Sequence, residues 1–181
     1  MPSEKNITQV DYAILGLLAQ SEMTGYEVRM VFEKTAMGSF SSSPGAIYPA
    51  LKRLQKHKLV AKKKDPDRRV DPLIITASGR KELRDWVLRP VTHDDVKSSL
   101  EMLVLRVAFL DSTDNEKKRK EFFASMIKAL KEQIAELEQY HKAASKDMPL
   151  GGRLTFEYGM ESYRSTLAWI QKVQRAYASK K

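Results

Sequence analysis

The chain has 181 residues, of which 42% are hydrophobic and 30% are charged, and it contains no cysteine. This length allows one or two small domains with a buried core. The lack of cysteine excludes disulfides and thiolate zinc sites. No apolar run approaches the roughly 18 residues of a membrane span, and the N-terminus does not have the pattern of a signal peptide. We therefore expect a cytoplasmic protein.

The positive charge is concentrated in one stretch. Of a formal net charge of +9, residues 52–69 contribute +7, from nine basic and two acidic side chains. Such a concentration predicts a surface that meets a polyanion, because charge that serves only solubility is spread along a chain.

Two capping boxes open the first two expected helices. Thr8 and Asp11 have the spacing of the first box, and apolar residues recur after them at helical intervals. Thr24 and Glu27 have the spacing of the second. A second helix is therefore expected from about Thr24 to Met37.

The third expected helix runs from Ser43 to His57 and has two different faces. Ser43 suits the N-cap, and Pro44 suits the first helical position. At about 100° per residue, one face is apolar and carries Ile47, Leu51 and Leu54. The opposite face starts small and then turns basic, with Gly45, Pro49, Lys52, Arg53 and Lys56. Small residues at a helix start allow close approach, and the free N–H groups there suit a phosphate.

A short hairpin and a fourth helix follow. Residues 59–64 and 70–76 have strand composition, and Asp65-Pro66-Asp67 between them has turn chemistry. Pro72 cannot donate a ladder hydrogen bond, so we expect an edge or a bulge there. A helix follows over residues 76–88. Three helices, a hairpin and a helix are the layout of a winged helix-turn-helix, in which the hairpin is the wing.

From residue 91 the pattern predicts a second, helical domain. A capping box at Thr113 opens a helix from about Asn115 to Lys146, about 48 Å long at 1.5 Å per residue. Its apolar residues recur at intervals of four and three as in a coiled coil, and His141 ends this seam. We expect the seam to meet both the last helix and a second copy of the chain. The predicted dimerisation residues are Phe123, Ile127, Leu130, Ile134, Leu137, Leu167 and Ile170.

The predicted fold class is therefore mainly α. Residues 1–90 form a winged helix-turn-helix DNA-binding domain with a two-stranded wing. Residues 91–181 form a helical dimerisation domain with a long coiled-coil-like helix.

With these elements placed, the chain resembles the PadR family of bacterial transcriptional regulators, in the longer subtype with a full helical C-terminal domain. The most specific match is Ser43-Pro-Gly-Ala-Ile-Tyr-Pro-Ala-Leu-Lys-Arg-Leu54. Shorter matches spread over nearly the whole chain are Thr24-Gly-Tyr-Glu27, Leu59-Val60, Thr76-Ala-Ser-Gly79 and Leu167-Ala-Trp-Ile170. Where the family usually carries an aromatic residue in the second wing strand, this chain has Pro72-Leu73-Ile74-Ile75.

The resemblance implies a homodimer that binds an inverted-repeat operator in double-stranded DNA, often as a repressor released by a small molecule. The third helix would enter the major groove, and the wing would touch the DNA backbone. The implied DNA-binding residues are Thr24, Tyr26, Ser42, Ser43, Gly45, Ala46, Tyr48, Pro49, Lys52, Arg53, Lys62, Lys63, Lys64, Arg68 and Arg69. Tyr48 lies at the edge between the two helix faces, which suits a phosphate contact better than base reading.

The sequence favours a regulator over an enzyme. The three histidines are scattered, and no Ser/His/Asp set or phosphate-binding glycine loop is visible. His93-Asp94-Asp95 could supply metal ligands, but the polar first turn of a helix is the favoured interpretation. We predict no catalytic residue, no metal and no cofactor.

Alternative interpretations stay open for the lysine run, for the two tryptophans and for the function. The run Lys62-Lys63-Lys64 either contacts DNA or is only the solvent-exposed end of a strand. Trp86 and Trp169 are either core or interface residues, or they line a ligand pocket. The alternative function is a winged-helix module that binds a protein partner or RNA through its basic face. The concentrated charge favours nucleic acid, and A-form RNA does not admit a helix into its major groove, so DNA is preferred.

Overall fold

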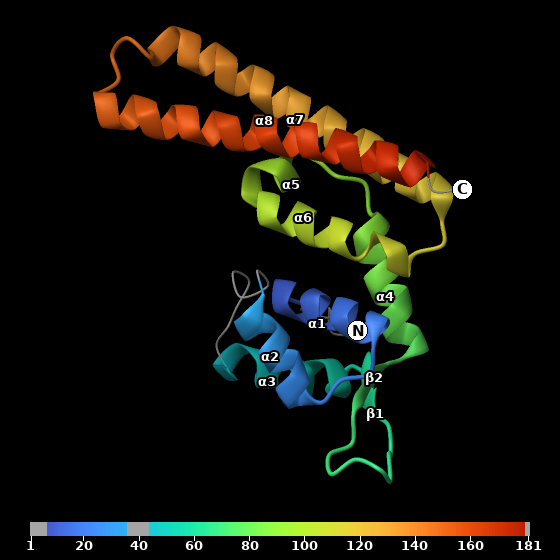
Figure 1. Cartoon of the computed structure of the whole chain (residues 1–181). Helices are drawn as coiled ribbons and strands as arrows, with labels where there is room; N and C mark the ends of the chain where they lie inside the picture. Colours follow the sequence, from blue (N-terminus) through green and yellow to red (C-terminus); the bar gives the residue numbers. More distant parts are fainter. Residues whose placement is uncertain (1–6, 36–43, 180–181) are drawn as a thin grey trace, which may run out of the picture. The chain divides into compact units, whose positions relative to one another are not determined.

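The computed structural model describes residues 7–35 and 44–179, and Figure 1 draws the chain. The chain forms two compact units, which interleave along the sequence. The first unit comprises Met1–Val87 and Leu105–Asp114, and the second comprises Leu88–Val104 and Asn115–Lys181. The chain first passes from one unit to the other between Val87 and Leu88, close to the predicted boundary between residues 90 and 91. That residues 1–90 and 91–181 are separate domains stays a prediction.

Both predicted capping boxes are present at the starts of α1 (Gln9–Gln20) and α2 (Gly25–Lys34). The Thr8 hydroxyl accepts from the Asp11 N–H, and the Asp11 carboxylate accepts from the Thr8 N–H at 2.7 Å. Thr24 and Glu27 repeat the pattern, with the return hydrogen bond at 2.6 Å. Each box satisfies two backbone donors that a helix start leaves open. The predicted extension of the second helix to Met37 lies partly outside the described residues.

The helix α3 (Pro44–Lys56) has the predicted apolar face. Ile47, Leu51 and Leu54 are buried, together with Ala50, and they pack toward α1 and α2. The helix continues through Pro49, which is exposed. Ser43, the predicted N-cap, lies outside the described residues.

The wing consists of β1 (Val60–Lys62) and β2 (Leu73–Ile75), which pair antiparallel with Val60 opposite Ile75. The backbone of Leu73 also pairs with Met23 on its other side, at 2.8 and 3.2 Å. Pro72 lies just before β2, where a missing N–H costs no ladder bond. Its carbonyl accepts from the Lys63 N–H at 2.9 Å. These contacts anchor the base of the wing and confirm the winged helix-turn-helix.

The start of α4 (Ala77–Leu88) packs tightly against the chain that enters β1. The Thr76 hydroxyl accepts from the Gly79 N–H at 3.0 Å and lies 2.8 Å from the Lys58 carbonyl oxygen. A Cβ on Gly79 would stand 2.1 Å from the Leu59 carbonyl oxygen. Glycine is required here because only a residue without a side chain fits.

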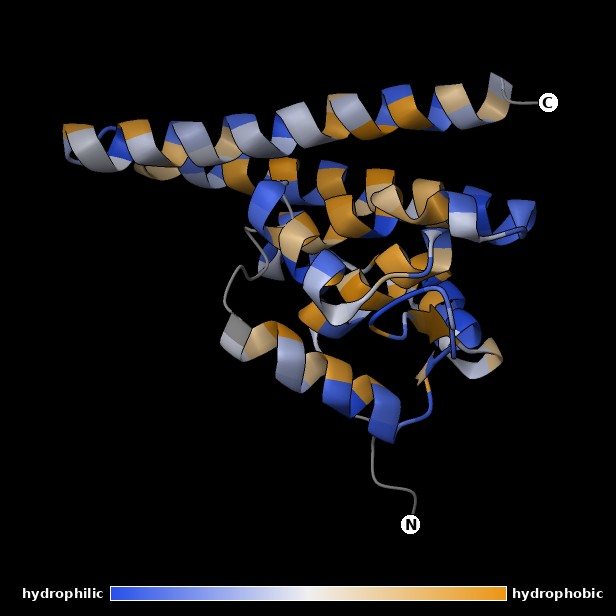
Figure 2. Cartoon of the chain, turned by 60° about the horizontal axis from the view of Figure 1, so that its bottom comes forward, coloured by the Kyte–Doolittle hydropathy of each residue, from blue (hydrophilic) through white to orange (hydrophobic). Residues whose placement is uncertain are grey.

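The last part of the first unit returns to α1 from the end of α6 (Leu100–Ala108) and the 3-10 helix η2 (Leu110–Ser112). The ring of Phe109 occupies the space that a Cβ on Gly16 would fill, at 2.2 Å. The buried guanidinium of Arg106 donates to the Val87 carbonyl at 3.1 and 3.2 Å. Apolar residues, orange in Figure 2, gather on the inward faces of these elements.

The second unit is built on a helical hairpin. α7 (Glu116–Ala144) and α8 (Leu150–Ser179) run side by side in opposite directions, as Figure 1 shows. α5 (His93–Ser98) packs along α7, where Lys97 and Glu136 form an ion pair at 3.0 Å. The Val91 N–H donates to the Ser125 hydroxyl at 2.9 Å. The long helix and its neighbour confirm the helical C-terminal region.

Within residues 7–35 and 44–179, no helix has the length and apolar composition needed to cross a bilayer.

Candidate nucleic-acid interface

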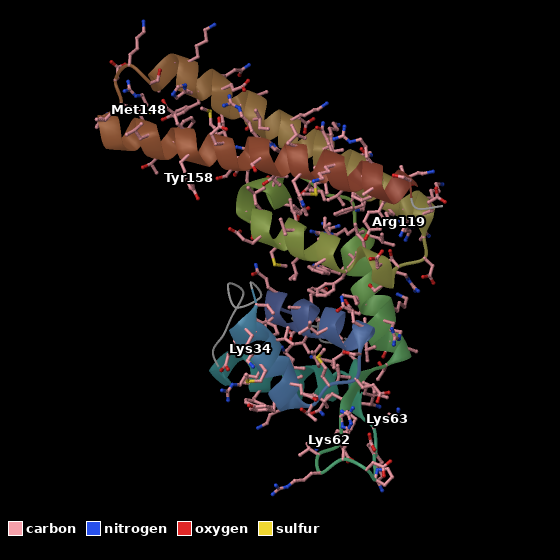
Figure 3. All side chains as sticks on the ribbon, in the orientation of Figure 1. Lys34, Lys62, Lys63, Arg119, Met148 and Tyr158 are labelled. Atoms are coloured by element: carbon pink, nitrogen blue, oxygen red, sulfur yellow. The ribbon has the colours of Figure 1, made fainter. Side chains whose placement is uncertain are left out.

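Exposed basic side chains gather on the wing. Lys62, Lys63 and Lys64 follow one another where β1 leads into the wing loop, and all three are exposed; Figure 3 labels the first two. Arg68 and Arg69 return on the other side of the loop and are also exposed. The structure thus brings the five predicted wing cations together on one short hairpin.

The exposed face of α3 supplies the second part of this surface. Gly45, Pro49 and Lys52 are exposed, and Ala46 is half-buried. Tyr48 is 41% exposed, although its ring edge lies against the start of α2. A Cβ on Gly25 would stand 3.4 Å from the Tyr48 ring, so this glycine allows α2 and α3 to approach closely at Tyr48.

Arg29 on α2 is a residue of this surface that the sequence reasoning missed. Its guanidinium lies 6.0 Å from the centre of the Tyr26 ring and donates to Glu33 at 2.8 Å. The hydrogen bond to Glu33 raises the pKa of Arg29, and the neighbouring Tyr48 hydroxyl adds to this effect. Arg29 is three residues after Tyr26 and therefore lies on the same helix face. This spacing is the sequence signal from which Arg29 could have been predicted.

The two α2 residues predicted to bind DNA differ in their surroundings. Tyr26 is largely exposed. Thr24 is half-buried, and its hydroxyl caps α2 by accepting from the Glu27 N–H. Ser42 and Ser43, also predicted to bind DNA, lie outside the described residues.

Arg53 requires a correction, because its charged group is bound by a buried carboxylate of α1. Nε and Nη2 of Arg53 donate to the two carboxylate oxygens of Asp11 at 2.9 Å each, and Nη2 also reaches the Thr8 hydroxyl at 3.2 Å. Asp11 is fully buried, and a buried carboxylate needs this partner. We therefore assign Arg53 to the α1–α3 contact and not to the groove-facing side of α3.

The surface carries its own acidic partners. The Lys63 ammonium lies 2.7 Å from Glu22, which stands between α1 and α2. The Arg68 guanidinium lies 3.3 Å from Asp65 in the wing loop and 4.0 Å from Glu27. In the described part of the chain, Lys62 and Lys64 have no such ion pair.

The predicted dimerisation residues divide into two groups. Phe123, Leu130 and Ile170 are buried within the single chain. Their assignment as dimerisation residues is therefore corrected, because their side chains belong to the core of the second unit. The half-buried residues are Ile127, Ile134, Leu137 and Leu167. A different group of apolar side chains near the α7–α8 turn is exposed: Tyr140, Leu150, Leu154 and Tyr158.

The described residues hold no group of three or more histidine, cysteine or carboxylate side chains placed to bind a metal ion. His93 opens α5 after a third capping box, formed by Thr92 and Asp95. His93, Asp94 and Asp95 thus form the polar first turn of α5. His141 stacks on Phe156 with ring centres 5.6 Å apart. Trp86 stacks on Tyr12 at 4.3 Å, inside the first unit.

A winged helix-turn-helix with a basic wing beside an exposed helix face defines the class of DNA-binding winged-helix proteins. Residues 14–85 match the "Transcriptional regulator PadR-like family", and residues 101–178 match the "Virulence activator alpha C-term" family. Residues 14–85 are thereby assigned to the PadR-like family of transcriptional regulators, which is not a family of enzymes.

The chain is also similar to individual proteins. The chain is 22% identical over 173 residues to the negative transcriptional regulator PadR of Bacillus subtilis, covering 90% of this chain and 93% of that protein. Among solved structures it is similar to B. subtilis PadR in complex with p-coumaric acid, with 24% identity, 92% and 96% coverage and a TM-score of 0.42. It is also similar to B. subtilis PadR in complex with operator DNA, with 23% identity, 90% and 94% coverage and a TM-score of 0.39.

Proposed function

We propose that this regulator represses transcription by binding, as a homodimer, an inverted-repeat operator in double-stranded DNA. The observation that carries the proposal is the exposed surface shared by α3 and the wing, where Tyr48 and Lys52 lie in the same unit as the lysines of β1. The curated relative is a negative regulator, which supports repression over activation.

The α3 helix enters the major groove with its exposed side. Gly45, Ala46 and Pro49 are small, so they allow close approach to base edges, and Lys52 reaches further along the groove. Tyr48 donates its hydroxyl to a phosphate at the groove's edge, with Arg29 beside it. Tyr26, at the start of α2, faces the same side as Arg29 and adds a contact to the DNA backbone.

The wing holds the DNA backbone without reading sequence. Lysine and arginine side chains on a short loop meet phosphates as point charges, and such contacts set position and affinity. Lys62, Lys63, Lys64, Arg68 and Arg69 all take this role. A short wing anchored at Leu73 and Met23 places them at a fixed distance from α3.

A second copy of the chain covers the exposed apolar residues near the α7–α8 turn. Leu154 and Tyr158 stand one helical turn apart on α8 and remain exposed in the single chain. In Figure 3, Tyr158 points away from the hairpin. A twofold dimer presents two α3 helices about 34 Å apart to successive major grooves, which requires an operator with inverted symmetry.

A small molecule that releases the operator completes the proposal. This element of the proposal rests on the family resemblance.

Titration of a labelled genomic fragment from upstream of the protein's own coding region, at several salt concentrations, tests the proposal. We expect binding that weakens steeply with salt, since released counterions set the slope. The K62A/K64A variant should bind every duplex more weakly, with a log–log salt slope smaller by about one unit for each lost phosphate contact. The K128A/K131A variant removes the same charge from α7 and should bind as the unchanged protein does.

RNA binding is the second candidate, and an RNA competitor of matched length separates the two. We expect duplex DNA to compete and RNA to fail, because the A-form major groove is too narrow for α3. Stronger competition by RNA, or no binding to any duplex, would contradict the proposal.

A further inference from the structure

Two cations of the wing are already bound to acids of the same unit. Lys63 lies 2.7 Å from a carboxylate oxygen of Glu22, and Arg68 lies 4.0 Å from one of Glu27. Both acids belong to one short segment, because Glu22 stands between α1 and α2 and Glu27 is in the first turn of α2. The wing and the start of α2 are therefore joined by charge as well as by the Met23–Leu73 backbone pair.

These two acids are accessible to solvent, and so are their partners. About half of each side chain in the Lys63–Glu22 and Arg68–Glu27 pairs is exposed. The pKa of Glu27 is lowered, first by the hydrogen bond from the Thr24 N–H and further by the positive charge of Arg68. The Glu27 carboxylate is therefore charged at neutral pH. A carboxylate that holds a cation occupies the place that a phosphate oxygen would take.

We propose that Glu22 and Glu27 compete with DNA phosphates for Lys63 and Arg68 and so lower the affinity of the wing for any duplex. The inference rests on the proposed DNA-binding function of the wing. When the wing meets a phosphate, Lys63 exchanges Glu22 for the phosphate, and Arg68 exchanges Glu27. In each exchange the free energy of the internal ion pair is lost, so the phosphate contact adds less to the free energy of DNA binding.

The wing then contains two kinds of cation. Lys62 and Lys64 have no ion pair among the described residues, so they meet phosphate without any exchange. Lys63 is restrained by Glu22, and Arg68 is restrained by Glu27 and also by Asp65, at 3.3 Å in the wing loop. Because phosphate contacts do not depend on base sequence, this restraint acts mainly on sequence-independent binding. Contacts of α3 with base edges are left unchanged, so the acids lower the affinity for every duplex by about the same factor.

A third pair on the same surface has the same form. Arg29, beside Tyr48, donates to Glu33 at 2.8 Å, and both side chains are about one-third exposed. Glu33, near the C-terminal end of α2, thus restrains a third cation of the surface.

A double-mutant cycle on Lys63 and Glu22 tests the proposal, with a labelled random-sequence duplex as the probe at low salt. Exposed ion pairs of this kind are weak, so E22Q should bind the duplex roughly two- to fivefold more tightly than the unchanged protein. In the K63A background the same change should give no gain, because Glu22 then has no cation to restrain. E27Q with R68A forms the second cycle, and glutamine at position 27 keeps the capping box intact.

The D85N variant is the charge-matched control. It also removes one acid from a surface ion pair, that of Lys81 with Asp85 on α4 at 2.8 Å. It changes the net charge by the same amount as E22Q without releasing a wing cation. We expect E22Q and E27Q to tighten binding more than D85N does, and the difference to shrink as salt screens the surface pairs.

Three outcomes decide the matter. A gain for E22Q that is equal in the K63A background, or equal to the gain for D85N, would mean that Glu22 acts only through net charge and would overturn the inference. An E22Q variant that binds no more tightly, while K62A/K64A weakens binding, would overturn it and leave the proposed function intact. Failure of the unchanged protein to bind any duplex would overturn both.

Discussion

The Arg53 guanidinium and the Asp11 carboxylate lie 2.9 Å apart and join the third helix to the start of the first. Asp11 also closes the capping box of α1 with Thr8, so one fully buried carboxylate serves both contacts. Arg53 follows Lys52 in the chain, and Lys52 is exposed on α3. Two adjacent basic residues of the most basic stretch therefore have different surroundings: Arg53 is paired with a buried carboxylate, and Lys52 is exposed to solvent.

The R53M variant should lose stability. Removing the guanidinium leaves Asp11 buried without its charge partner, and breaking such a pair costs about 3 kcal/mol in the free energy of unfolding. Urea unfolding followed by circular dichroism measures this change.

The K52M variant is the matched control for R53M. It removes the same charge one residue away, so unfolding should change little while DNA affinity falls. An R53M protein as stable as the unchanged protein, but weakened in DNA binding, would return Arg53 to the groove-facing side of α3.

Tyr48 gives the sharpest test of the orientation of α3. Replacing it with alanine should cut DNA affinity by about 1 kcal/mol, the net value of one hydrogen bond, and leave the melting temperature nearly unchanged. The Y48F variant keeps the ring against Gly25 and should lose nearly as much, because the hydroxyl makes the contact. Binding titrations and thermal melts of both variants measure these effects. A variant that melts far lower yet binds as before would identify Tyr48 as a core residue.

The sequence predicted the parts of this structure that are encoded over a few residues. The Thr8–Asp11 and Thr24–Glu27 boxes are recognisable because a cap and its partner are three residues apart. The buried face of α3 follows from the spacing of Ile47, Leu51 and Leu54. These local signals were enough to place the helices and the wing, and so to find the basic surface.

The roles that depend on distant partners were not predictable. Helical periodicity placed Arg53 on the basic side of α3, but its partner Asp11 is 42 residues earlier in the chain. The seam through Phe123 and Leu130 showed that α7 needs a partner helix. Periodicity does not say whether that helix belongs to the same chain, and here α8 supplies it. The acids that restrain the wing were missed for the same reason.

Gly79 should not tolerate a side chain. In G79A the new methyl group would stand 2.1 Å from the Leu59 carbonyl oxygen, so α4 and the strand entry must move apart. We expect a loss of about 1–3 kcal/mol in the free energy of unfolding, as for other overpacked sites. Thermal unfolding measures the loss, and weaker DNA binding should accompany it because the wing lysines lie at the end of β1 and directly after it.

The G159A variant is the control for G79A. Gly159 lies within α8, and a Cβ there would meet no atom within 4 Å. Alanine in a helix interior is favoured over glycine by about 0.5–1 kcal/mol, so this variant should be slightly more stable. Equal effects of the two substitutions would mean that the close contact at Gly79 is absent in solution.

The last prediction concerns the dimer. The buried seam residues already pack against other residues of the same chain. We therefore expect a second copy to bind the exposed apolar side chains near the α7–α8 turn. Leu154 and Tyr158 are 54% and 75% exposed, and orange segments mark the start of α8 in Figure 2.

Light scattering at micromolar concentration should give twice the chain mass of 20.7 kDa. L154E/Y158E should give the mass of one chain, because two carboxylates cannot be buried unpaired at a twofold contact. Val70 in the wing loop is 59% exposed, so V70E makes a similar change elsewhere and should leave the dimer intact. A single-chain mass for the unchanged protein would refute the dimer, and a dimeric L154E/Y158E protein would place the contact on another face of the second unit.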